Sequence, residues 1–324
     1  MKAILLLTLL TSVWMHPAYA FLGLGMTPFQ KACRDGADAR VQFCVVDDTG
    51  LPVANARVNV FFDMIERSKG RRVIGCTDTN GVFIAEAKTG GVLEIEVTGD
   101  GYYKTADKMC FIEMGNEHDV QDGKWQPWGM LKKIVLRPIK NPKARRVDSR
   151  DWRLTKNINV WLAFDFEKYD FVRPYGIGVV NDVEIKFEWD EKFGTKHNGM
   201  GVFLRFSDLF SGGYYAERFL NSSFTGVYEA NKNMTYSNNF HYYRRLIRDS
   251  KGRKVGGEGE KFDKSKTLVG RTRCILDEKG NLVSAQYFQI ENLEFACSRE
   301  KEAAIRFNLI FNPTPNDTNL EPKR

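Results

Sequence analysis

Runs of alternating apolar residues, each closed by a turn cluster, fill the stretch from Cys44 to Tyr103. Two of these runs cover Ala56–Val60 and Leu93–Val97, and clusters of Asp, Asn, Thr and Gly separate the runs. A period of two is the spacing of a strand with one buried face, and such clusters favour tight turns. The stretch therefore predicts several consecutive antiparallel strands that form a small β-sandwich.

Two motifs in this stretch suggest a family. A strand motif of the form Gly-x-Pro-Val-x-x-Ala-x-Val-x-Val covers Gly50–Val60, and a Thr-Asp-x-Asn-Gly-x-Phe hairpin motif covers Thr77–Phe83. The pattern resembles the carboxypeptidase regulatory-like, transthyretin-related sandwich family. That resemblance implies a transthyretin-like fold for the N-terminal half, and a non-catalytic role because this family mostly supplies accessory modules.

The first residues have the features of a secretory signal peptide. Lys2 precedes an apolar run over residues 3–13, and residues 18–20 form a small-x-small cleavage site. We expect cleavage after Ala20 and a mature protein that begins at Phe21 and is secreted or periplasmic. No stretch reaches roughly 18 apolar residues, so no transmembrane segment is expected.

The remaining length suits two β domains. About 300 residues exceed one small sandwich but allow two separate cores. At the start, Thr27 as N-cap, Pro28 at the first helical position and Gly36 as a stop predict a short helix. The expected division is a helical segment over 21–38, the regulatory-like sandwich over 39–139, a polar linker over 140–152 and a second β domain over 153–324.

The second half is also predicted to be an antiparallel β-sandwich or a strongly curved sheet. Residues 182–189 alternate throughout and residues 305–311 nearly so, with turn residues at 277–281 between two further apolar runs. Two polar segments, 207–236 and 248–266, are expected to be loops, the second of them mobile. The whole chain is therefore predicted to be all-β. Residues 169–179 and the tail from Asn312 resemble uncharacterised secreted bacterial proteins, a likeness that implies no activity.

Charge and export argue against a nucleic-acid partner. The formal net charge is +7, from 48 Lys and Arg against 41 Asp and Glu, which is mild for a nucleic-acid binder. It leaves open a weak preference for anionic surfaces or polysaccharides.

An even number of cysteines in an exported chain suggests disulfides. The four cysteines in the first half could form two disulfides in three different ways, whereas Cys274 and Cys297 could pair only with each other if pairing stays within domains. We expect the latter two to be buried on the inner face of the second domain, either bonded or as separate thiols, since a tight hairpin near Lys279 would not align them. The first-half candidates are Cys33, Cys44, Cys76 and Cys110.

The residues predict no catalytic centre and no cofactor. The chain lacks the His-x-x-Glu of metallocarboxypeptidases, the paired His of intradiol dioxygenases and a Gly-x-Ser-x-Gly elbow. Residues 78–81 could begin a calcium loop but fit a hairpin turn better, with Gly81 at positive φ. A hydrolase using two carboxylates remains an alternative. Its candidates are Asp165, Glu167, Asp170, Asp182 and Glu184.

Aromatic residues near loops give the main functional hypothesis. A sugar ring has an apolar face that stacks on Trp or Tyr, so exposed aromatics suggest glycan binding, although large rings also plug the ends of sandwiches. We expect a secreted non-catalytic module that binds a glycan or a cell-surface protein. A structural envelope subunit is the alternative, and the oligomeric state is not predicted. The candidate ligand-binding residues are Trp125, Trp128, Tyr214, Tyr215, Tyr242 and Tyr243.

Overall fold

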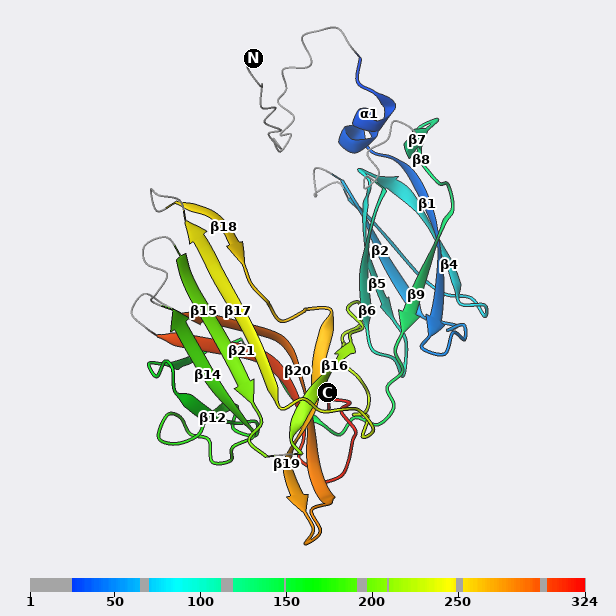
Figure 1. Ribbon diagram of the computed structural model, residues 1–324. Helices are drawn as coiled ribbons and strands as arrows, with labels where there is room; N and C mark the ends of the chain where they lie inside the picture. Colours follow the sequence, from blue (N-terminus) through cyan, green and yellow to red (C-terminus); the bar gives the residue numbers. More distant parts are fainter. Residues whose placement is uncertain are drawn as a thin grey trace, which may run out of the picture. The chain divides into compact units, whose positions relative to one another are not determined.

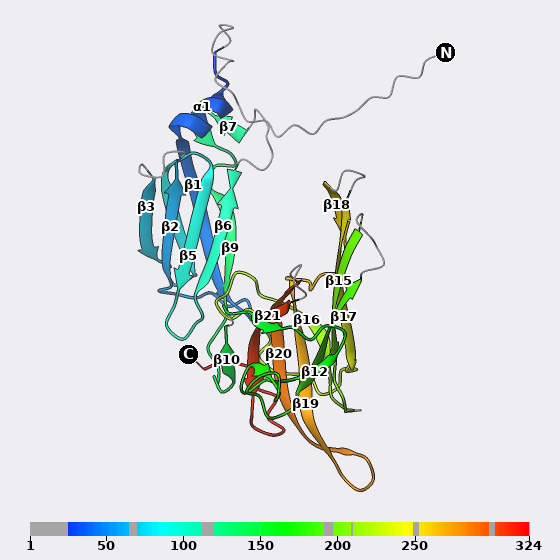
Figure 2. The same cartoon turned by 90° about the vertical axis from the view of Figure 1, so that its left-hand side faces the viewer.

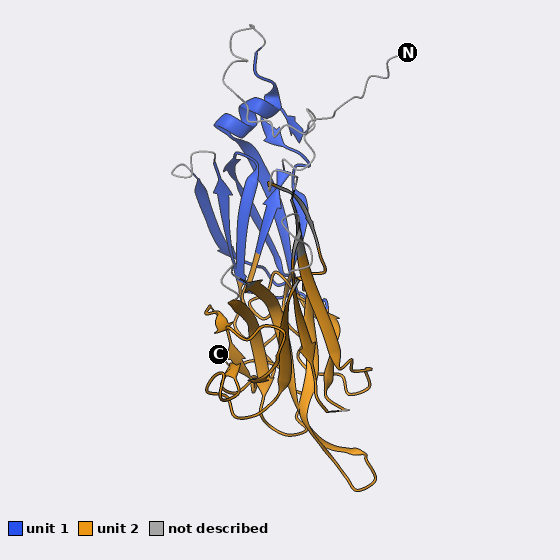
Figure 3. Ribbon diagram, turned by 60° about the vertical axis from the view of Figure 1, so that its left-hand side comes forward, with its two compact units in different colours: residues 1–46, 50–97, 107–134 blue, residues 47–49, 98–106, 135–324 orange. Residues whose placement is uncertain are grey.

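The computed structural model describes residues 25–64, 70–111, 119–148, 150–190, 197–208, 210–248, 253–297 and 302–323. The expected signal peptide and the residue Phe21 lie outside these ranges. The chain divides into two compact units (Figure 3). Unit 1 contains residues 1–46, 50–97 and 107–134, and unit 2 contains residues 47–49, 98–106 and 135–324.

The first half of the chain forms two sheets, and in one of them β8 pairs with β1 in parallel (Figures 1 and 2). One has the order β4-β1-β8-β7, with β9 also paired to β1, and the other has the order β3-β2-β5-β6. The bounds are α1 Pro28–Asp35, β1 Ala37–Asp47, β2 Arg57–Asp63, β3 Arg71–Cys76, β4 Val82–Thr89, β5 Val92–Thr98, β6 Thr105–Cys110, β7 Val120–Gln121, β8 Lys124–Trp125 and β9 Met130–Leu136.

Alternation along these strands produces the buried core of unit 1. Val41 and Phe43 on β1, Val60 on β2 and Leu93 on β5 are all fully buried, while their sequence neighbours are at least partly exposed. Burial of such side chains contributes about 1.5–3 kcal/mol each relative to exposure. The sequence prediction of a β-sandwich in this half is confirmed.

Two local predictions in unit 1 are also confirmed. Thr27 caps α1, since its side chain accepts a hydrogen bond from the Gln30 amide and the Gln30 side chain accepts one from the Thr27 amide. In the hairpin, Asp78 accepts hydrogen bonds from the amides of residues 80 and 82. Gly81 has a φ of 73°, and a Cβ there would lie 2.4 Å from the Val45 carbonyl oxygen.

Unit 2 contains two six-stranded sheets, ordered β10-β21-β20-β19-β16 with β11 also paired to β21, and β13-β12-β14-β15-β17-β18. Their bounds are β10 Arg145–Val147, β11 Arg153–Thr155, β12 Trp161–Asp165, β13 Asp170–Phe171, β14 Val183–Asp190, β15 His197–Arg205, β16 Gly212–Glu217, β17 Asn239–Arg248, β18 Lys254–Glu258, β19 Lys266–Leu276, β20 Leu282–Cys297 and β21 Ala303–Asn312. No helix in the described ranges is long and apolar enough to cross a membrane.

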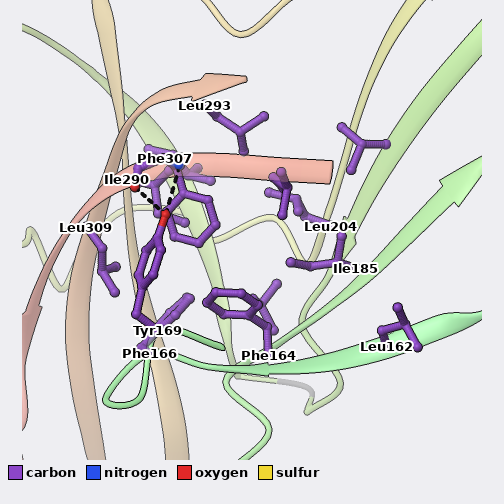
Figure 4. Close-up of a cluster of buried hydrophobic side chains, with 14 of the residues drawn as sticks. Leu162, Phe164, Phe166, Tyr169, Ile185, Leu204, Ile290, Leu293, Phe307 and Leu309 are labelled. Atoms are coloured by element: carbon purple, nitrogen blue, oxygen red, sulfur yellow. Dashed lines mark hydrogen bonds between the residues drawn. The ribbon is translucent and has the colours of Figure 1, made fainter. Parts of the chain in front are cut away.

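Both sheets contribute to an aromatic core in unit 2 (Figure 4). Phe164 of β12 packs against Phe307 of β21 at a ring separation of 5.4 Å, and against Tyr169 at 5.5 Å. The Tyr169 hydroxyl donates to the Phe307 carbonyl oxygen at 2.6 Å and accepts from its amide at 3.0 Å. These two hydrogen bonds allow the Tyr169 hydroxyl to lie inside an apolar core, because burying a hydroxyl without a hydrogen-bond partner costs free energy. The all-β prediction therefore holds for both halves.

Three segments predicted to lack regular structure contain strands. β16 lies within the expected loop 207–236, β18 within 248–266, and β10 within the linker 140–152, where Ala144 is also fully buried. Each is short, and each pairs with a longer neighbour: β16 with β19, β18 with β17, and β10 with β21. Pairing with that neighbour, and not a local apolar pattern, defines these strands, so periodicity could not find them.

Candidate functional site

Trp125, which the sequence places on the surface, lies in the interior of unit 1. Its side chain is fully buried, and its indole Nε1 donates a hydrogen bond of 2.9 Å to the Thr89 carbonyl oxygen. The ring stacks on Phe111 at 5.7 Å and meets Phe29 of α1 edge-on at 6.0 Å. The prediction that Trp125 offers a ring to a ligand is wrong, because these two aromatic rings cover it.

Trp128 is partly exposed. The Lys124 ammonium group lies 4.9 Å from the centre of the Trp128 ring, and the Trp128 amide donates a hydrogen bond to the Gln126 side chain. Trp128 belongs to unit 1, whereas the predicted tyrosines belong to unit 2. A role of Trp128 in ligand binding stays a prediction.

Tyr242 also points inward. It is 2 % exposed, its hydroxyl lies 2.5 Å from that of Tyr215, and burial raises the pKa of its phenol. The prediction that Tyr242 contacts a ligand is wrong, since it belongs to the core. Tyr215 itself is exposed, while Tyr214 is half-buried, accepts a hydrogen bond from the Asn231 amide and packs edge-on against Tyr236.

Tyr243 lies on the opposite, outer face of β17, as the next residue in a strand must. The inner positions of this sheet are filled by buried residues such as Leu162, Ile185 and Val202. The alternate positions on the same strands point away from that core. This outer face carries the candidate functional site.

A row of aromatic residues crosses the outer face from strand to strand. Trp161 on β12 lies opposite Lys186 on β14, Lys186 lies opposite Phe203 on β15, and Phe203 lies opposite His241 on β17. Tyr243 follows two residues beyond His241 and therefore has the same orientation. We call Trp161, Phe203, His241 and Tyr243 the aromatic row; Figure 1 shows the strands that carry it, β12, β15 and β17, together with β14.

The rings of the aromatic row touch one another. Phe203 and His241 are stacked at 3.9 Å with an interplanar angle of 10°, and His241 and Tyr243 are stacked at 5.6 Å and 23°. Trp161 meets Phe203 edge-on at 6.4 Å. Gly201, opposite Tyr243, leaves room here, because a Cβ at Gly201 would lie 3.0 Å from Nε2 of His241. His241 is exposed and the other three rings are half-buried, so solvent reaches the row.

Charged side chains surround the row in matched pairs. Arg205 donates to Glu184 at 2.7 Å, and Lys186 donates to Glu188 at 2.6 Å. The same cations lie over the rings, with the Arg205 guanidinium 4.1 Å from the centre of Trp161 and the Lys186 ammonium group 4.9 Å from that of Phe203. The face thus combines apolar rings with donors and acceptors, and these two pairs add no net charge.

Sequence reasoning found only Tyr243 among the row residues. Trp161, Phe203 and His241 lie within the predicted strands 158–166, 201–206 and 240–247, so their outward orientation could be read from alternation alone. Their alignment could not, because it depends on which strands pair and in which register.

The predicted disulfide between Cys274 and Cys297 is wrong, because Cys274 is a free thiol. Thr272 lies opposite Gln286, and Cys297 lies 11 residues further along β20 (297 − 286), or roughly 35 Å at the rise of an extended strand. A disulfide needs Cα atoms within about 7 Å. The Cys297 side chain lies outside the described part of the chain. The first-half candidates are free as well: Cys33, Cys44, Cys76 and Cys110.

Cys274 is also not on the inner face. Arg273 adopts a φ of 53° where the register of β19 with β20 shifts, and this irregularity breaks the alternation. Thr272 remains buried, but Cys274 is only partly buried, beside Leu282 and Tyr287.

The carboxylates named for a possible hydrolase are all engaged. Asp182 forms a two-point ion pair with Arg273 at 2.8 and 2.9 Å, and Glu167 contacts the same guanidinium at 3.1 Å. Asp165 and Asp170 accept backbone hydrogen bonds, and Glu184 binds Arg205, as described above. In the described ranges no group of three or more His, Cys, Asp and Glu residues could hold a metal ion.

Comparison with known proteins identifies no family for this chain. No protein-family model matches the sequence, and no curated protein matches it. Among solved structures, it is similar to 3-chlorocatechol 1,2-dioxygenase from Rhodococcus opacus 1CP, with 13% identity over 32% of this chain and a TM-score of 0.26. Chlorocatechol 1,2-dioxygenase from Pseudomonas putida gives 14% identity, the same coverage and the same TM-score. The matches span 61% of each dioxygenase chain.

Proposed function

We propose that this protein is a non-catalytic carbohydrate-binding protein and that the aromatic row is its binding surface. The observation that supports this is the register that aligns Trp161, Phe203 and His241 across one exposed sheet face, with Lys186 between the first two. Sugar rings bind proteins by placing their C–H faces against aromatic rings while their hydroxyls meet nearby polar groups. Both kinds of group are present on this face.

The dimensions and charge of the row narrow the ligand. Three strand spacings separate Trp161 from His241, which is roughly 14 Å. Such a length fits an oligosaccharide better than a single sugar ring. The cations Lys186 and Arg205 are each paired with a glutamate, so the expected ligand is a neutral glycan.

The test is a glycan-array screen of the protein, followed by calorimetry with the best neutral oligosaccharide. Trp161→Ala and Phe203→Ala should each weaken binding about tenfold or more, equivalent to about 1.4 kcal/mol, with little change in melting temperature. Trp152→Ala is the matched control, because Trp152 is a half-exposed tryptophan outside the row and is not a candidate ligand-binding residue. Unchanged affinity in both row variants, or a loss in the control alone, would reject the proposal.

We also propose that the protein is exported and cleaved after Ala20, on the basis of the charged, apolar and small-residue segments at its N-terminus. N-terminal sequencing of protein recovered from the periplasm or medium of an expressing bacterium should begin at Phe21. Protein that retains Met1 and stays in the cytoplasm would contradict export.

A further inference from the structure

Unit 2 contains a cleft of about 700 Å³ that is separate from the aromatic row. This volume is in the usual range for sites that bind small molecules. Its lining comes from four parts of the chain that are distant in sequence. The lining residues are Thr98, Tyr102, Tyr103, Lys104, Arg146, Asp148, Ser223, Pro322 and Lys323.

The cleft is positively charged. Lys104, Arg146 and Lys323 face one carboxylate, Asp148, so the lining carries a net charge of +2 (three minus one). The Lys323 side chain is exposed to solvent. A partly enclosed site with excess positive charge attracts anions more strongly than an open surface does.

Arg146 is held in place before any ligand binds. Its Nε donates to Asp148 at 2.7 Å, and its Nη1 donates to the Ser223 carbonyl oxygen at 3.1 Å. Within the described ranges, its Nη2 donors have no hydrogen-bond partner. A guanidinium fixed on one side and open on the other suits binding of a carboxylate or phosphate group.

The backbone around the cleft is fixed by hydrogen bonds between distant segments. The Ser223 amide donates to the Lys104 carbonyl oxygen at 2.8 Å, and the Lys323 amide donates to that of Ala144 at 2.8 Å. The Tyr103 hydroxyl donates to the side chain of Glu321 at 3.0 Å. These bonds reduce the ordering that a ligand would have to impose, which favours binding.

Two buried charged residues hold the backbone of segments next to the cleft. Arg137 is 4 % exposed and donates to the carbonyl oxygens of Phe224 and Gly226 at 2.7 and 2.6 Å. Glu321 is fully buried and accepts from the amides of Lys140 and Asn141 at 2.8 and 2.5 Å. Burial lowers the pKa of Arg137. Neither residue lines the cleft, so both are positioning residues.

We propose that this cleft binds a small acidic sugar, with the anionic group against Arg146 and Lys323 and the hydroxylated body beside Thr98, Ser223 and the ring of Tyr102. The cations of the lining would bind the anionic group of the ligand, and the hydroxyl groups of the lining would form hydrogen bonds with the hydroxyls of the sugar. This site is independent of the neutral-glycan surface proposed above.

The test uses calorimetry on the full mature chain with two acidic sugars and their neutral analogues. Galacturonate and glucose 6-phosphate represent the carboxylate and phosphate forms, and galactose and glucose are the matched neutral forms. At least one acidic sugar should bind ten times more tightly than its analogue, and raising the salt concentration should weaken it. Equal affinity for acidic and neutral forms would overturn the proposal. Inorganic phosphate binding as tightly as glucose 6-phosphate would overturn the sugar part of it.

Variants then locate the binding. Arg146→Gln should weaken binding of the acidic sugar at least tenfold. Lys323→Gln should also weaken it without affecting the fold, because the Lys323 side chain is exposed. Lys143→Gln is the matched control, because Lys143 pairs with Asp317 and does not line the cleft. Trp161→Ala should leave this binding unchanged, which separates failure here from failure of the carbohydrate surface. Equal affinity in Lys323→Gln and the control would overturn the assignment of the cleft.

Discussion

At the scale of single residues, Asp165 shows how a buried charge is kept in unit 2. One of its oxygens accepts from the amides of Glu167 and Lys168 at 2.8 and 3.1 Å, and the other accepts from those of Val179 and Val180 at 2.8 and 3.1 Å. Burial alone would raise the pKa of this carboxyl, but the four amides outweigh it and the pKa is lowered. The charged form therefore stabilises two turns at once.

Replacing Asp165 with Asn should lower the free energy of unfolding at pH 7 by about 1–3 kcal/mol, because hydrogen bonds to a charged acceptor are lost. A lowered pKa gives stability that is complete above the unfolded value of about 3.9 and is lost as the pH falls through the folded value. The difference between variant and wild type should therefore shrink below about pH 4. Urea unfolding between pH 3 and pH 7 measures this, with exposed Asp100→Asn as control. A pH-independent difference would contradict the role of the charge.

Two thiols of unequal environment give a second test at this scale. Cys76 is exposed, whereas Cys274 is packed in unit 2, accepts a hydrogen bond from Ser211 and has a pKa raised by burial. The thiolate is the reactive form, so iodoacetamide at pH 8 should modify Cys76 well before Cys274. Peptide mapping by mass spectrometry follows both sites. Equal rates would show that Cys274 is not enclosed as described.

At the scale of elements, β20 is a long strand of 16 residues that is interrupted by a β-bulge. Its register with β21 shifts between Glu291 and Glu294, and Asn292 adopts a φ of 53° there. Glu291 is buried at this bulge, forms an ion pair with Arg218 at 3.2 Å and accepts from the Thr225 hydroxyl at 2.8 Å. The bulge thus anchors the loop that follows β16.

Arg218→Met should destabilise the protein by about 3–5 kcal/mol, because it leaves the Glu291 carboxylate buried without a cation. Adding Glu291→Gln should recover part of that loss, since a neutral amide costs less to bury than an unpaired charge. Chemical denaturation of both single variants and the double variant measures the coupling. Additive losses would show that the two side chains act independently.

The sequence predicted the positions of strands and turns better than the pairing between strands. Alternation located β14 and β21, and the Thr27 cap and the Gly81 turn were readable because their chemistry is local. The aromatic row was not readable, since its residues come from three strands and only the pairing of those strands aligns them. Trp125 was misplaced because loop-like flanking residues say nothing of the helix and phenylalanine that cover its ring.

At the scale of the molecule, the compact units do not follow the order of the chain. Residues 98–106 and 135–139, which the sequence-based division assigns to the first domain, fall in unit 2. There the Ala106 amide donates to the Asn221 carbonyl oxygen at 2.8 Å, and Thr105 bridges to Ser222. Such long-range pairings have no local signature, so composition could not place this boundary.

A fragment that ends at Ile139 should fold its sandwich but leave part of residues 98–106 unprotected. Its strand pairings lie within the fragment, whereas the acceptor of the Ala106 amide does not. Hydrogen exchange should show the Ala106 amide protected in the full chain and exchanging freely in the fragment. The Tyr103 amide, which donates to Arg137 inside the fragment, is the internal control. Equal protection of Ala106 in both would contradict this division.

The hydrogen bond between Tyr103 and Glu321 joins residues 218 positions apart. At 5–20 residues per second, a ribosome needs roughly 10 to 45 s to add the partner after Tyr103 has been made. Throughout that interval the segment around Tyr103 has no tail to bind, although the sheets of the first half can already pair. Unit 2 is therefore completed late in synthesis, and its segment around Tyr103 must stay available until Glu321 has been added.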